Sequence, residues 1–164
     1  MMDAQQWWGD LPTWITTAAV AIAVLQFMAD RRRRRAEEDR ESKVQATGLT
    51  SWVTTNDARD FYGVVIANTS GATFHDVVIE VALKGFPSAR PITLRILPPG
   101  TYLVRHKSSG DPFEWAFARE LREADQPLQP FMNTAEWAVT AIRFSDNLGQ
   151  RWTADERAIL TREA

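Results

Sequence analysis

The chain of 164 residues contains no cysteine. This absence excludes disulfides, thiol catalysis, cysteine-ligated zinc and iron–sulfur clusters, and it fits a reducing compartment. Histidine is nearly absent as well, and His75 and His106 are not spaced as a zinc-binding pair. The glycine-rich phosphate-binding loops and the G-x-S-x-G turn of serine hydrolases do not occur. We therefore expect a protein that is not an enzyme and that holds no cofactor or metal.

Basic residues do not outnumber acidic ones, with 19 Lys and Arg against 21 Asp and Glu. Because nucleic-acid-binding domains are normally basic, we expect no nucleic-acid partner. The charges are unevenly placed along the chain. Five consecutive arginines, 31–35, closely follow an uncharged run of 19 residues from Leu11 to Ala29.

The uncharged run has the length of a membrane-spanning helix. At about 1.5 Å per residue it covers roughly 29 Å, close to the hydrocarbon thickness of about 30 Å. Asp10 can cap such a helix, and Pro12 falls in its first turn. A buried helix of a globular fold is the alternative, which the arginines disfavour. The residues expected at the membrane interface are Trp7, Trp8, Trp14, Arg31, Arg32, Arg33, Arg34 and Arg35.

Charge asymmetry predicts the orientation. No basic residue precedes the apolar run, which argues against a cleaved signal peptide and, by the positive-inside rule, places the N-terminus outside. We expect the chain in the plasma (inner) membrane, with its C-terminal domain in the cytoplasm. The predicted segments are a short external tail (1–10), a transmembrane helix (11–30), a charged juxtamembrane helix (31–43) and a cytoplasmic β-sandwich (44–164).

From residue 44 onward the pattern becomes one of short alternating or apolar segments separated by turns. Strands are predicted over residues 46–54, 61–68, 76–84, 91–97, 101–107, 134–145 and 150–153. The near-continuous apolar run 61–68 indicates a strand covered on both faces. The predicted fold class is mainly β: the N-terminal helix with its cytoplasmic extension, then an antiparallel immunoglobulin-like sandwich of about seven strands with one inserted helix. A small barrel is the alternative.

The predicted inserted helix, residues 112–124, is the most suggestive part of this domain. Phe113, Phe117 and Leu121 recur every four residues, which favours an amphipathic helix. This helix either closes an open end of the sandwich or presents aromatic side chains to a partner. The possible partner-binding residues are Phe113, Trp115 and Phe117.

Several stretches together resemble a known group of proteins. They are GDLPTW before the apolar run, the arginine run, Trp52 on the first predicted strand, VVIANTSGATFHDVVIEV, LPPGTYLV and AIRFSDNLGQRW. The chain resembles uncharacterised single-pass membrane-anchored β-sandwich proteins common in actinobacteria. The resemblance implies a topology and a fold, and it implies no catalytic residue.

Three functions stay open at this stage. The first is a protein-interaction adaptor that binds an unknown protein partner, for instance through an exposed strand edge. The second is a membrane-surface protein that senses anionic lipid through the arginine run and the aromatic segment. The third is an accessory factor of a mobile-element or defence system. Membrane lipid is the expected partner of the helix, and homo-oligomers through its alanine-rich face are an option.

Overall fold

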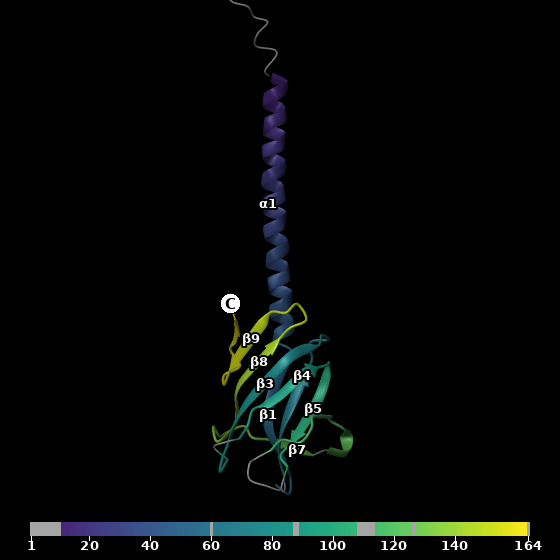
Figure 1. Cartoon of the computed structure of the whole chain (residues 1–164), viewed down its shortest axis with the longest axis vertical. Helices are drawn as coiled ribbons and strands as arrows, with labels where there is room; N and C mark the ends of the chain where they lie inside the picture. The colour runs from purple at the N-terminus through teal and green to yellow at the C-terminus, as the bar shows by residue number, and fades with distance from the viewer. Residues whose placement is uncertain (1–10, 60, 87–88, 108–113, 126, 164) are drawn as a thin grey trace, which may run out of the picture. The chain divides into compact units, whose positions relative to one another are not determined.

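Figure 1 shows the computed structural model of the chain, which describes residues 11–59, 61–86, 89–107, 114–125 and 127–163. In the helix, side chains are described from Ala18 onward. The chain divides into two compact units, residues 1–41 and 42–164. Each unit is described by itself below.

Helix α1 runs without a break from Leu11 to Ala46. Its only proline, Pro12, lies in the first turn, where a missing N–H costs little, and the rest consists largely of good helix formers. The helix therefore continues through the charged residues 31–43, as predicted. Thr47 and Gly48 close its end by donating their backbone N–H groups to the carbonyls of Lys43 and Gln45.

The predicted transmembrane span over residues 11–30 is not supported. Within the described part of the chain, no helix is long and apolar enough to cross a membrane. Trp7 and Trp8 lie outside the described residues, and so does the side chain of Trp14. The five arginines, 31–35, are all exposed.

The second unit is built from two five-stranded antiparallel sheets. Sheet 1 has the order β6-β5-β2-β1-β7, and sheet 2 has the order β10-β9-β8-β3-β4. The strands of sheet 1 are β1 (Leu49–Asn56), β2 (Tyr62–Asn68), β5 (Gly100–Arg105), β6 (Arg119–Glu120) and β7 (Leu128–Pro130). Those of sheet 2 are β3 (Phe74–Leu83), β4 (Ile92–Leu97), β8 (Trp137–Ser145), β9 (Arg151–Asp155) and β10 (Leu160–Arg162).

The core lies between the two sheets. Alternation along each strand sends every second side chain inward, so Val64 and Ile66 of β2 meet Phe74 of β3 in one buried cluster. Phe74 and Phe144 pack edge to face, with ring centroids 4.8 Å apart. The packing of the two sheets on this shared core confirms the prediction of a mainly β fold with two antiparallel sheets.

Strand β2 is buried on its other face as well. Val65 is 1% exposed although it points away from the core cluster. It lines a hollow of about 400 Å³ together with Leu121, which directly follows β6, and Leu128, which begins β7. As predicted, the near-continuous apolar pattern of residues 61–68 therefore results from burial of the strand on both faces.

The predicted inserted helix over residues 112–124 is wrong where the structure describes it. Residues 114–118 are extended, β6 follows, and the 3-10 turn Glu123–Asp125 precedes β7. The reason is pairing across the sheet: Leu103 and Tyr102 of β5 pair with Arg119 and Glu120. The short edge strands β6, β7 and β10 bring the described strands to ten, against about seven predicted.

Candidate functional site

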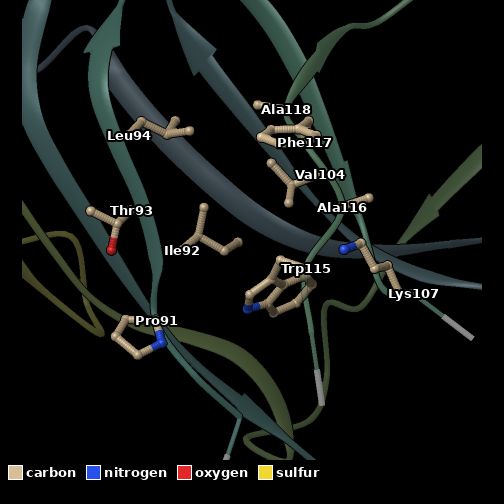
Figure 2. A pocket seen from close by; sticks show the side chains of 10 residues that line it. All are labelled: Pro91, Ile92, Thr93, Leu94, Val104, Lys107, Trp115, Ala116, Phe117 and Ala118. Carbon is tan, nitrogen blue, oxygen red and sulfur yellow. The ribbon is translucent and has the colours of Figure 1, made fainter. Parts of the chain in front are cut away.

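A groove opens between strand β4 and the extended segment 114–118, with a volume of about 220 Å³ (Figure 2). One wall belongs to sheet 2 and the other to sheet 1, so the groove lies between two sheet edges. We call it the β4 groove. Its lining residues are Pro91, Ile92, Thr93, Leu94, Val104, Lys107, Trp115, Ala116, Phe117 and Ala118.

The first wall is a free strand edge. Within the described chain β4 pairs with β3 alone and stands last in its sheet. In an antiparallel strand every second residue directs its N–H and C=O to the same side. About half of the residues of β4 therefore direct backbone hydrogen-bonding groups away from β3. Thr93, Arg95 and Ile96 are exposed along this edge.

The second wall continues the hairpin between β5 and β6. The backbone N–H of Ala116 donates to the carbonyl of Arg105 at 2.8 Å, and His106 pairs with Trp115. The next pair along the two strands is Leu103 with Arg119. Between the two pairs, β5 has two residues, 104–105, whereas the other strand has three, 116–118. The extra residue makes a β-bulge in residues 116–118.

The bulge explains how the two aromatic side chains of this wall differ. Trp115 and Ala118 both pack against the core, which strict alternation over three residues would not allow. Phe117 lies between them and is 95% exposed. In Figure 2 it lies beside Ala118 and Val104, on the wall opposite Leu94.

Trp115 connects the two walls. Its indole Nε1 donates a hydrogen bond to the backbone carbonyl of Arg90 at 2.7 Å, just before β4 begins. Its ring is half-buried and packs against the core. The hydrogen bond therefore fixes the sheet 1 wall to the entry of β4 at one end of the groove.

The sequence predicted three partner-binding residues, and these differ in what the structure describes of them and in their exposure. Phe113 lies outside the described residues, Trp115 is half-buried, and Phe117 is exposed. Trp115 and Phe117 line the same groove. Sequence reasoning missed the edge of β4 as the facing wall. Pro91 directly before an alternating run was the available signal, since proline in sheets is confined to strand starts, edges and bulges.

The rim of the groove is positively charged. Arg90 and Arg95 are exposed on the β4 side, residues 89–97 contain no acidic residue, and the exposed Asp76 of β3, opposite Arg95 in the strand register, offsets one of the two charges. On the other side, Lys107 and Glu114 form an exposed salt bridge of 3.2 Å that balances two charges. Burial lowers the pKa of His106 from its ordinary 6.5.

A second polar feature is the buried carboxylate of Asp146, in the turn between β8 and β9. It is 2% exposed and accepts four hydrogen bonds. The donors are Ser42 Oγ (2.5 Å), Trp152 Nε1 (3.0 Å), Leu148 N (2.9 Å) and Gln150 N (2.8 Å). Burial raises the pKa of Asp146, but these hydrogen bonds lower it by more, so the pKa lies below its ordinary value.

The Asp146 network is structural rather than chemical. All its partners are donors from the fold itself, and Ser42 belongs to the last turns of α1. The turn prediction for residues 146–149 is confirmed, with Gly149 at φ 78°. Across the described residues, no group of three or more His, Asp or Glu side chains is placed to hold a metal ion.

Comparison of the chain with protein-family models, with curated proteins and with solved structures finds no match. Any function is therefore argued from the β4 groove and the helix alone.

Proposed function

We propose that this chain is a membrane-anchored β-sandwich that binds a protein partner and catalyses no reaction. The β4 groove is the observation that carries the proposal. It combines a free strand edge, an apolar hollow and an almost fully exposed aromatic side chain, Phe117. Aromatic residues next to a pocket are typical anchors of protein–protein interfaces.

Anchoring is supported by the distribution of exposed apolar side chains on α1. Successive residues of a helix are turned by about 100°, so apolar residues at many successive positions cover all its sides. A helix that is apolar all round is normally buried, either in lipid or among other helices. Over residues 18–29, the large exposed apolar side chains are Val20, Ile22, Val24, Leu25, Phe27 and Met28.

The proposed anchor needs more of the helix than the described side chains. Residues 18–29 alone cover about 18 Å, which is short of the roughly 30 Å of a bilayer core. The proposal rests on the whole uncharged run, Leu11–Ala29. The arginine run 31–35 that follows it supports the same topology, with the sandwich in the cytoplasm.

The orientation is testable by labelling, because the chain has no cysteine of its own. Single cysteines at Asp3 and at Asn147 are treated in intact cells with a reagent that does not cross membranes. We expect labelling at position 3 and none at position 147. Labelling at position 147 alone would reverse the proposed orientation, and labelling at both positions or at neither would refute a membrane span between them.

A photo-crosslinking amino acid at position 117 tests the adaptor function in cells. We expect a discrete crosslinked product that contains a second protein. The matched control is the same amino acid at Leu148, which is 69% exposed in the β8–β9 turn and lies outside the groove. If position 117 yields no product, or if both positions yield the same products, the adaptor function is refuted.

Anionic-lipid sensing is the second candidate function, and the exposed run Arg31–Arg35 favours it. Each arginine near an anionic surface contributes about 1 kcal/mol. Flotation of the full chain with anionic and with neutral vesicles, before and after replacing all five arginines by glutamine, tests it. A sensing function requires that anionic vesicles bind more strongly and that the replacement removes this difference.

A further inference from the structure

We infer that the β4 groove takes an extended, acidic segment of another protein, which adds to β4 as a new edge strand. This inference rests on the proposed adaptor function and specifies its partner. It follows from the backbone of β4, the size of the hollow and the charge of the rim.

The backbone of β4 provides the binding mode. Six residues, Ile92–Leu97, run along the free edge of sheet 2. An incoming strand can pair with the N–H and C=O groups that point away from β3, as in strand addition to other sheet edges. The other edge strands are shorter: β6 has two residues, and β7 and β10 have three each. Among the described strands, β4 is therefore the longest available edge.

The hollow selects the side chains of the incoming strand. About 220 Å³ is below the 300–1,000 Å³ that ligand pockets normally have, and it suits one or two aliphatic side chains. Residues two apart on a strand point to the same face, at a spacing of roughly 6.7 Å. Ala116 and Ala118 leave room on the opposite wall, and Phe117 can close over the strand. The expected pattern is apolar residues at alternating positions.

The rim selects the charge. Arg90 precedes β4 and Arg95 lies within it, and the exposed Asp76 of β3, which falls opposite Arg95 in the strand register, offsets only one of these two charges. Carboxylates at the other alternating positions of the incoming strand would complement them. A second copy of this chain is a poorer occupant, because pairing two β4 edges brings four arginines to one seam.

The probes are synthetic peptides, and the protein is the full chain in a non-ionic detergent. One peptide alternates valine and glutamate, a second alternates valine and lysine, and a third is the first with proline at its central positions. Hydrogen exchange of the 91–97 backbone amides is followed by mass spectrometry, and affinity is followed by anisotropy of labelled peptide. We expect the glutamate peptide alone to bind and to slow exchange in β4. Proline removes donors of the new ladder, so the third peptide should not bind.

Charge reversal at position 95 provides the matched comparison. Arg95→Glu is expected to lower the affinity for the glutamate peptide roughly five- to ten-fold, because an exposed attraction becomes a repulsion. The same variant should gain affinity for the lysine peptide. Arg157→Glu makes the same change in the exposed turn between β9 and β10 and should alter neither affinity. Arg95 is exposed, so unfolding midpoints of the two variants are expected to stay close to that of the native chain.

Several results would overturn the inference. They are equal binding of the two charged peptides, binding without slower exchange in β4, or no binding by any alternating peptide. Slower exchange in β4 that grows with protein concentration and needs no peptide would assign the groove to a second copy. If these results appear while position 117 still crosslinks to a protein in cells, the adaptor function stands and only the strand-addition mode fails.

Discussion

Replacing Asp146 with alanine is expected to lower the free energy of unfolding by about 3–7 kcal/mol, although the residue lies in a turn. The carboxylate is 2% exposed and accepts four hydrogen bonds. Alanine removes the acceptor and leaves all four donors behind. The cost depends on how many of these donors water can reach.

The two side-chain donors account for most of the expected loss in the free energy of unfolding. Ser42 is 6% exposed and Trp152 is 4% exposed, so neither can readily turn to solvent. A buried donor left without a partner costs about 1–3 kcal/mol. The backbone N–H groups of Leu148 and Gln150 are only partly buried and can donate to water instead. We assign them about 0.5 kcal/mol each.

The chain contains a matched control for this substitution. Asp155 begins a turn of the same form between β9 and β10, and its Oδ1 accepts the backbone N–H groups of Arg157 (2.9 Å) and Ile159 (2.8 Å). Asp155 is exposed, and within the described chain no buried side chain like those of Ser42 and Trp152 donates a hydrogen bond to its carboxylate. Asp155→Ala is therefore expected to cost about 1 kcal/mol.

Guanidinium unfolding of the full chain, followed by near-ultraviolet circular dichroism, measures both variants. If Asp146→Ala costs no more than Asp155→Ala, the buried donors carry no energy and the reasoning is refuted. The pH dependence gives a second check. Because the pKa of Asp146 is lower in the folded chain than its ordinary 3.8, its contribution is complete above that value and is lost as the pH falls through the folded pKa. The difference between native chain and variant should shrink accordingly in acid.

Three further predictions concern single positions. Ala158 adopts φ 59°, where glycine is favoured, so Ala158→Gly should raise the free energy of unfolding by about 0.5 kcal/mol, while Gly149→Ala at φ 78° should lower it by about 1 kcal/mol. A Cβ on Gly48 would stand 2.7 Å from that of Ser70, so Gly48→Ala should cost about 1–3 kcal/mol in the same unfolding assay. The hydrogen bonds from Arg119 and from the Arg122 backbone lower the pKa of Asp125 to about 2, below its ordinary 3.8. Protection of the Arg122 amide from hydrogen exchange should therefore fall between pH 4 and pH 2, as the carboxylate gains a proton. Asp125→Asn should remove this pH dependence.

The local sequence predicted most strands because each carries its own signal. The alternating run of β3 and the doubly apolar run of β2 were both read correctly from side-chain period alone. The turn at residues 146–149 was read from its Asp and Gly. The role of Asp146 was not, because its partner Ser42 lies 104 residues away in the chain. No local pattern marks a serine on a charged helix as a buried donor.

The error at residues 112–124 has a simple geometric cause. Phe117 and Leu121 are four residues apart, and a spacing of four is compatible with the helical period of 3.6 and also with the strand period of 2. Trp115 was the residue that distinguished the two patterns. It lies off the helical stripe but lies on the alternating one, and the structure has it in an extended segment. An aromatic residue at every second position should therefore have favoured a strand.

Even a correct strand prediction would not have located the β4 groove. Whether Trp115 or Phe117 faces the core depends on the bulge in residues 116–118, which exists only because β5 supplies two residues where this segment supplies three. Whether β4 is free depends on the order of sheet 2, since β3 pairs with β4 on one side and with β8 on the other. Both are relations between distant segments. A groove between two sheet edges is thus set by strand order and register, and the alternation within each strand only selects which side chains line it.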